Sequence, residues 1–224
     1  MIEVIPAILP ESLEDLKAHL LRVRGLVKRV QIDIVDGVFA PSRTWPYTAG
    51  GHDELARLAD RSDGLPLWQE FDFELDMMVR NPEVVVDVWL HAGVGSVIVH
   101  IGSTNAPSAV FEKVRSADAL VGIAIRPLTP AEEYEPLIGE IDFIQFMGSD
   151  RVGLSGVSLD PSVPERVAAF HARHPSVIIG VDIGVNEETA PALVAAGARR
   201  LAIGSAIFNA ENPAEAIKYF QNLS

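Results

Sequence analysis

Three aspartates, Asp33, Asp76 and Asp182, lie near the ends of short β-rich runs in this sequence. Successive side chains of a strand alternate between two faces, so Gln31 and Asp33 share one face, as do Glu74 and Asp76. If these runs are parallel strands of a barrel, the three aspartates lie at matching height around one pocket. The chain has no cysteine, so its chemistry must use carboxylates, histidine, lysine, arginine or hydroxyl groups. Any single aspartate could instead cap the helix that follows its strand.

Glycines follow the last two β-rich runs, at Gly184 and at Gly204-Ser205. A glycine just past a strand lets backbone amides approach a ligand closely, and the corresponding loops of parallel barrels commonly bind a phosphate. Gly184, Gly204 and Ser205 are therefore predicted to bind a phosphate group. Without their place in the repeating pattern, such residues would indicate simple turns. Asp36, which precedes a glycine, is assigned to a turn and not to catalysis.

The elements that must position these residues alternate regularly along the chain. Each of eight β-rich runs is followed by a break and then by a segment of helical periodicity. The runs begin near Val4, Arg29, Phe73, Ser96, Leu120, Phe143, Val177 and Arg200. This repetition predicts an α/β fold, a closed (β/α)8 TIM barrel that forms a single domain over residues 1–224. An open, doubly wound sheet is the alternative.

The composition and net charge of the chain limit the kinds of molecule that it is expected to bind. The 224 residues are 48% hydrophobic, and 18 Lys and Arg against 31 Asp and Glu give a net charge of −13. This charge opposes attraction to nucleic acid or to an anionic membrane surface. The N-terminal residues show no leader pattern, and no apolar run approaches the roughly 18 residues of a membrane span. We therefore expect a cytoplasmic protein without nucleic-acid or membrane partners.

Six motifs follow one another in a recognisable order: IPAIL at 5–9, QIDIVDG at 31–37, DMMVRNP at 76–82, VH at 99–100, VDIGVN at 181–186 and GSAIF at 204–208. Together they resemble the ribulose-phosphate 3-epimerase family over nearly the whole chain. The resemblance implies a sugar-phosphate substrate and a proton transfer at C3 of a ketopentose phosphate. One carboxylate removes the proton from one face and a second returns a proton to the opposite face. Asp33 and Asp182 match these two acids.

The resemblance also implies a divalent metal, and here the chain departs from the family. The family usually uses two histidines and two aspartates as ligands, but Gln31 and Asp76 occupy the histidine positions. The implied ligand set is Gln31, Asp33, Asp76 and Asp182. Because all of these offer oxygen, the set favours Mn²⁺ or Mg²⁺ over Zn²⁺. A second departure is Ile183, which stands where the family has the first glycine of its phosphate-binding turn.

Arg126 and Met147 complete the predicted substrate site. Arg126 follows the fifth strand, where the family has asparagine, and Met147 ends the sixth. Converging carboxylates raise one another's pKa unless a cation balances them, so either a hard metal ion or Arg126 should supply positive charge. An ordinary salt bridge at the rim is the alternative for Arg126. His100 is either catalytic or a hydrogen-bonded core residue, and Gln145 is expected to satisfy a neighbouring polar group.

Three functions remain open from the sequence. The first is an isomerase that resembles ribulose-5-phosphate 3-epimerase. The second is a diverged phosphosugar enzyme on the same barrel, although decarboxylation is disfavoured because 31–36 lacks the lysine of the related D-x-K-x-x-D motif. The third is a non-catalytic phosphosugar-binding protein, suggested by the changed metal ligands. The resemblance also suggests a homo-oligomer.

Overall fold

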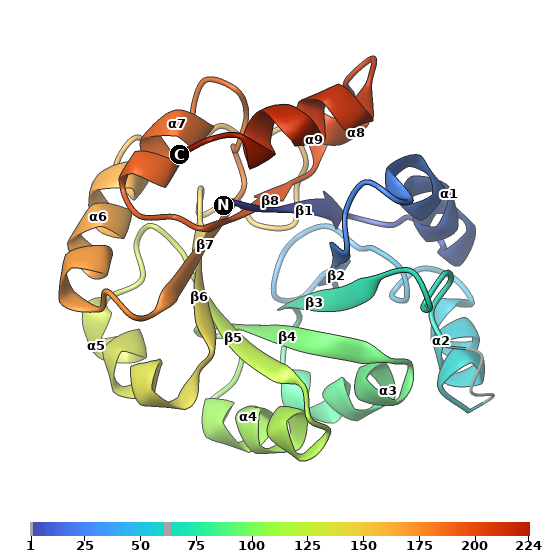
Figure 1. Ribbon diagram of the computed structural model, residues 1–224. Coiled ribbons are helices and arrows are strands. Elements are labelled where there is room, and N and C mark those ends of the chain that lie inside the picture. The colour runs from blue at the N-terminus through green and yellow to red at the C-terminus, as the bar shows by residue number, and fades with distance from the viewer. Residues whose placement is uncertain (1, 61–63) are drawn as a thin grey trace.

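In the computed structural model, which describes residues 2–60 and 64–224, eight parallel strands close into a barrel in the order β1 to β8 (Figure 1). The strands are β1 (Glu3–Ile8), β2 (Arg29–Val35), β3 (Asp72–Met78), β4 (Val94–His100), β5 (Leu120–Ile125), β6 (Phe143–Met147), β7 (Ile178–Asp182) and β8 (Arg200–Ile203). Pairing of β1 with β8 closes the sheet. The predicted (β/α)8 TIM barrel is confirmed, and the open sheet is excluded.

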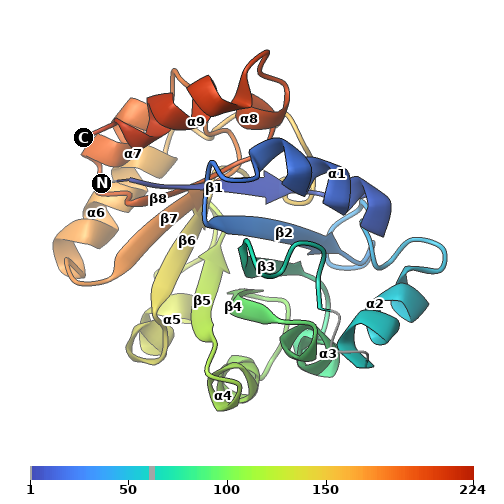
Figure 2. The same cartoon turned by 45° about the vertical axis from the view of Figure 1, so that its right-hand side comes forward.

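Helices surround the barrel, as two views show (Figures 1 and 2). They are α1 (Leu13–Val23), α2 (Gly51–Asp60), η1 (Pro82–Val84), α3 (Val86–His91), α4 (Pro107–Ser116), α5 (Ala131–Tyr134), η2 (Glu135–Glu140), α6 (Val163–Arg173), α7 (Ala190–Ala195), α8 (Ser205–Phe208) and α9 (Pro213–Gln221). The helix α1 begins after Ser12, whose side chain accepts a hydrogen bond from the Asp15 amide at 3.1 Å. It buries one apolar face that consists of Leu16, Leu20 and Val23.

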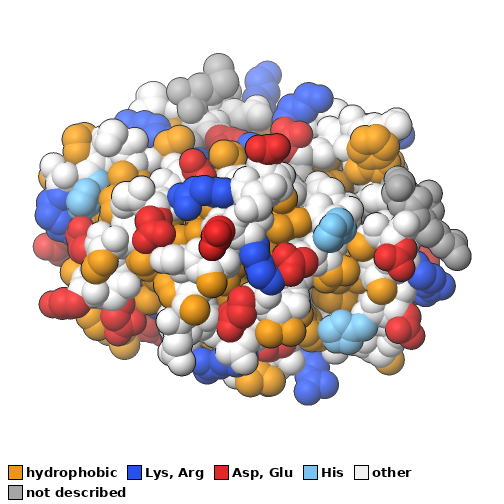
Figure 3. Space-filling view, turned by 90° about the horizontal axis from the view of Figure 1, so that it is seen from below, with side chains coloured by type: hydrophobic (Ala, Val, Ile, Leu, Met, Phe, Trp, Pro, Cys, Tyr) orange, Lys and Arg blue, Asp and Glu red, His pale blue; other side chains and the backbone are white. Residues whose placement is uncertain are grey.

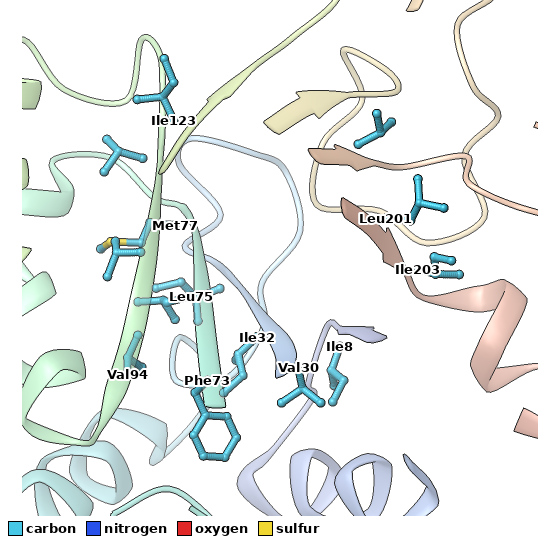
Figure 4. Packing of buried hydrophobic residues seen from close by; sticks show 14 of the residues in the cluster. Ile8, Val30, Ile32, Phe73, Leu75, Met77, Val94, Ile123, Leu201 and Ile203 are labelled. Atoms are coloured by element: carbon cyan, nitrogen blue, oxygen red, sulfur yellow. The ribbon is translucent and has the colours of Figure 1, made fainter. Parts of the chain in front are cut away.

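The strands are apolar toward the helices and partly polar toward the barrel interior. Val30, Ile32 and Phe73 belong to the main hydrophobic core and point toward the surrounding helices (Figure 4). The side chains between them in sequence turn the other way. A smaller apolar cluster joins inward residues of the strands to the segments after β2 and β6, and it consists of Val35, Ala40, Met78, Ile98, Ala124, Phe143, Met147 and Val152. This alternation places the polar residues of β2 and β3 inside the barrel.

An ion-pair network with Arg200 and Glu74 buried at its centre closes the N-terminal end of the barrel. Arg200 donates from Nη2 to Glu74 Oε2 at 2.5 Å and from Nε to Glu3 Oε2 at 2.9 Å. Ser96 Oγ also donates to Glu74 Oε2, at 2.9 Å, and the guanidinium lies 4.0 Å from the centroid of the Phe143 ring. Glu74, which shares the inward face of β3 with Asp76, is thus held at the base of the barrel, away from the loops at its C-terminal end.

The outer surface shows no single-sign patch on the face seen in Figure 3, where acidic and basic side chains are interspersed with apolar ones. Among the helices formed by the described residues, none combines the length and the apolar character that crossing a bilayer requires.

Candidate active site

Asp33, Asp76 and Asp182 meet inside the C-terminal half of the barrel, as the strand pattern predicts. Asp33 and Asp76 are register partners on β2 and β3, and Asp182 ends β7. One carboxylate oxygen from each lies within 4.8 Å of the others. All three side chains are buried, with residue exposures of 2%, 0% and 7%. Three carboxyl groups therefore share one small volume from which water is largely excluded.

Gln31 joins two of these acids. Its Nε2 donates to Asp33 Oδ1 at 2.8 Å and to Asp182 Oδ2 at 3.4 Å. Its Oε1 is buried and has no hydrogen-bond partner among the described residues. The amide thus orients two carboxylates that come from opposite sides of the barrel, and it leaves one oxygen free to accept a further donor or to bind a cation.

Asp76 is held from the other side by two residues. His100 Nε2 lies 2.6 Å from Asp76 Oδ1, with both residues buried. Gln145 Nε2 donates to Asp76 Oδ2 at 3.1 Å. This confirms that Gln145 satisfies a neighbouring polar group. The sequence places His100 on the inward face of β4 and so suggests a polar contact inside the barrel. It does not show that the partner is Asp76.

The crowding of the carboxylates changes their proton affinity. Burial, followed by the charges of Asp182 and Asp76, raises the pKa of Asp33 well above its usual value. Burial, followed by the charge of Asp76, raises the pKa of Asp182 to about 7. Near neutral pH the cluster therefore retains protons or requires a cation.

This shift makes the stability of the metal-free protein depend on pH. An acid whose folded pKa is raised binds its proton more tightly in the folded state, so stability falls as pH rises from about 4 toward about 7. Asp182→Asn removes this penalty. In excess chelator, the variant should melt several degrees above the wild type at about pH 8, and the difference should vanish near pH 4. Thermal unfolding at both pH values measures this, and an equal or lower melting temperature at about pH 8 would contradict it.

A pocket adjoins Asp33 and Asp182. It has an empty volume of about 500 Å³, part of it open to solvent, and it is lined by Asp33, Asp182, Gly184, Gly204 and Ser205 together with residues 153–157 of the loop after β6. The structure thus brings the two predicted catalytic acids and the three predicted phosphate-binding residues to the same cavity. The loop is tied to the segment after β2, because Ser42 Oγ donates to the Gly153 carbonyl.

Gly184 has a backbone that only glycine adopts easily, with φ of 72°. A Cβ there would lie 2.3 Å from the Leu159 backbone nitrogen. The preceding Ile183 also has a positive φ, 71°, although it is not glycine. Its amide donates to Asp182 Oδ1 at 2.7 Å. Ile183 therefore adopts the left-handed backbone conformation that glycine would adopt at this position of the turn.

Arg126 and Met147 lie outside the lining of this pocket. The Arg126 guanidinium carbon is 5.4 Å from the centroid of the Phe39 ring. Within residues 2–60 and 64–224, no salt bridge joins Arg126 to the three aspartates. Met147 is buried inside the barrel and receives a 3.7 Å contact from Gln145. Of the two sources of positive charge expected from the sequence, the geometry thus favours a metal ion over direct contact with Arg126.

The donor set fits a hard divalent cation. Three carboxylates with oxygens within 4.8 Å of one another supply the charge, and the unpartnered Gln31 Oε1 offers a neutral oxygen beside them. Oxygen ligands of this kind suit Mg²⁺ or Mn²⁺ better than Zn²⁺. Asp33, Asp76, Asp182 and Gln31 are the residues that would hold such an ion.

Residues 3–208 match the family model described as "Ribulose-phosphate 3 epimerase family". The chain belongs to this family. A ribulose-phosphate 3-epimerase of Eremothecium gossypii is 28% identical over 222 residues, covering 98% of this chain and 91% of the relative. One from Mycobacterium bovis is 27% identical, covering 96% and 89%. Membership of the ribulose-phosphate 3-epimerase family confirms the resemblance and the expectation of an epimerase-like enzyme.

Solved structures confirm the fold. A 3-hexulose-6-phosphate synthase superposes with a TM-score of 0.68 at 18% identity and covers 99% of this chain and 98% of its own. KGPDC from Streptococcus mutans gives a TM-score of 0.72 at 11% identity, with coverages of 99% and 97%. At such identities the likeness concerns the TIM barrel and not the reaction.

Proposed function

We propose that this protein epimerises a ketopentose phosphate at C3, with Asp33 and Asp182 as the two acid–base groups. The observation that carries the proposal is their place in one pocket with Gly184, Gly204 and Ser205. A phosphate held by the backbone of these three residues leaves the sugar chain facing the acids. Strands β2 and β7 approach that chain from different sides of the barrel.

Inversion requires one ionised acid and one protonated acid at the same time. One carboxylate removes the C3 proton, the electron pair moves into an enediolate between C2 and C3, and the other acid donates a proton to the opposite face of C3. Before a cation binds, the raised pKa values of Asp33 and Asp182 favour a cluster that holds a proton near neutral pH. The Gln31 amide, which donates to both side chains, keeps them oriented toward the same space.

Asp33, Asp76, Asp182 and Gln31 are the proposed ligands of a divalent ion, with Mn²⁺ or Mg²⁺ favoured. When bound, the ion supplies a Lewis acid that stabilises negative charge on substrate oxygen. The loop of residues 153–157 lines the pocket beside the reacting atoms.

A coupled assay with ribulose 5-phosphate tests the function. The protein is assayed with Mn²⁺, Mg²⁺, Zn²⁺ and excess chelator. Turnover with Mn²⁺ or Mg²⁺ that is lost in chelator is expected. Absence of turnover with every metal would refute the epimerase. Tight sugar-phosphate binding without turnover would favour the non-catalytic binding protein, and turnover of another phosphosugar would favour the diverged enzyme.

The phosphate end of the pocket is tested by Gly184→Ala. The new Cβ would lie 2.3 Å from the Leu159 nitrogen, so the backbone that binds phosphate must shift. We expect kcat/KM to fall roughly 10- to 100-fold, mainly through KM. Gly25→Ala is the matched control, because Gly25 has a similar φ of 74° and nothing within 4 Å of its Cβ position. An unchanged KM in Gly184→Ala would remove this residue from the phosphate site.

Arg126 is proposed to bind the substrate at the pocket rim and not to balance the aspartates. Arg126→Ala should therefore raise KM about tenfold, the worth of one charge-assisted hydrogen bond. Its effect on Mn²⁺ affinity should be less than about threefold, because no salt bridge joins Arg126 to the acids within the part of the chain that the structure describes. Steady-state kinetics and calorimetric Mn²⁺ titration measure the two quantities. Loss of Mn²⁺ affinity would show that Arg126 acts on the cluster, and an unchanged KM would leave it a packing role on Phe39.

A further inference from the structure

His100 is a buried, polar residue that the proposed proton transfers do not use. It ends β4, is 1% exposed, and places its Nε2 atom 2.6 Å from Asp76 Oδ1. A carboxylate that binds a metal is ionised and only accepts hydrogen bonds, so with Asp76 as a ligand Nε2 carries the proton in this contact. Nδ1 is buried and has no hydrogen-bond partner among the described residues. The ring is therefore committed to a single polar contact, and that contact is with Asp76.

Asp76 contacts a side-chain partner at each of its two carboxylate oxygens. His100 donates to Oδ1 from β4, and Gln145 donates to Oδ2 from β6 at 3.1 Å. The imidazole is in turn held by the Phe39 ring, whose centroid is 5.3 Å away at an interplanar angle of 62°. The plane of the Asp76 carboxylate is thus set by two strands other than its own.

A buried carboxylate without such donors carries a large desolvation penalty and can rotate away from a metal. With them, the remaining lone pairs of Asp76 point in a fixed direction. One oxygen of Asp76 lies within 4.8 Å of oxygens from Asp33 and Asp182, the separation that a single shared cation spans. His100 itself is not part of that group of converging ligand atoms.

We propose that His100 is a positioning residue for a metal ion: its Nε2 hydrogen bond orients Asp76 as a ligand, and Gln145 assists from the other oxygen. This inference rests on the proposed use of Asp76 as a metal ligand. Outer hydrogen bonds of this type typically change metal affinity by about 10- to 100-fold. His100 acts through Asp76 and makes no bond to the ion.

Calorimetric titration with Mn²⁺ tests the role without measuring activity. His100→Ala should weaken Mn²⁺ binding about 10- to 100-fold, whereas His100→Gln, which can still present an N–H donor to Asp76, should stay within about threefold of wild type. His52→Gln on the exposed face of α2 is the control. Thermal unfolding in chelator checks that each variant is folded. If His100→Ala does not fold, Gln145→Met removes the second donor, and its Mn²⁺ affinity should fall several-fold.

The outcomes separate this proposal from the proposed reaction. Wild-type affinity in His100→Ala, or in Gln145→Met where that variant is used, would refute the positioning role. An equal loss in His100→Gln and His100→Ala would mean that the histidine nitrogen binds the ion directly. A wild-type protein that binds no Mn²⁺ would refute the metal site and the role of His100 together. A protein that binds Mn²⁺ with the expected pattern but turns over no ribulose 5-phosphate would refute only the epimerase.

Discussion

Asp33→Asn and Asp182→Asn are each expected to lower kcat for epimerisation by about 10³-fold or more, at the upper end of what one general acid or base contributes. Each substitution keeps the shape of the side chain and removes its ability to exchange a proton. The Asp182 variant is the cleaner test of chemistry, because the Asn oxygen can still accept the 2.7 Å hydrogen bond from the Ile183 amide. Coupled assays at saturating substrate and metal measure kcat.

Hydrogen exchange distinguishes a two-acid mechanism from other causes of inactivity. With one acid lost, the remaining carboxylate can still remove the C3 proton from one face. Each variant should therefore exchange the C3 hydrogen of only one of the two epimers with deuterated water, and the two variants should select opposite epimers. Exchange of both epimers by one variant would contradict the assignment.

Asp36→Asn is the matched control for these variants. Asp36 lies near the barrel mouth, but its Oδ1 accepts the amides of Val38 and Phe39 at 2.8 Å each, and its Oδ2 accepts the Arg80 amide at 2.8 Å. It therefore stabilises a turn, as the sequence predicts, and Asn keeps the acceptor for two of these three amides. We expect kcat within a few-fold of wild type. A loss as large as that of Asp33→Asn would show that any change of charge near the mouth inactivates the protein.

Among the substitutions discussed, Arg200→Met is expected to lower the free energy of unfolding most, by about 3–5 kcal/mol. The reason is that it leaves the buried Glu74 carboxylate without its cation. Burial opposes the charged guanidinium, yet Glu74 and Glu3 together outweigh that effect and raise the pKa of Arg200 above its usual value. The melting temperature should fall by roughly 10 °C for a chain of this size. Denaturant unfolding gives the free energy of unfolding directly.

The double variant Glu74→Met, Arg200→Met decides whether the unpaired charge is the cause. Removing both partners leaves no buried ion, so much of the stability should return. Lys113→Met is the control: its ion pair with Asp87 is exposed and should be worth less than about 1 kcal/mol. A double variant no more stable than Arg200→Met alone would show that packing against Phe143, and not charge, dominates at the base of the barrel.

Much of the fold and part of the site could be predicted from local patterns. Eight β-rich runs at regular spacing indicated the barrel, because the hydrophobic periodicity of a strand or a helix can be recognised from residues that are close in sequence. The period of two along a strand placed Asp33 and Asp76 on the inward face, and the ends of strands located Asp182 and the loops at Gly184 and Gly204. These inferences needed no knowledge of which strands meet across the barrel.

Other features depended on the closed barrel itself. Gln31 reaches Asp182, 151 positions away, and Arg200 reaches Glu74, 126 positions away, only because eight tilted strands close and bring their inward side chains together. Sequence order carries no such distances.

The same holds for the balance of charge in the cluster. From sequence alone, either Arg126 or a metal ion could offset the charge of the three aspartates. In the tertiary structure, the Arg126 guanidinium packs over the Phe39 ring. Asp76 instead forms hydrogen bonds with His100 and Gln145. Local periodicity thus determined which residues face inward, whereas barrel closure and side-chain conformation decided which of them touch, because contact between buried groups depends on separations of a few ångströms.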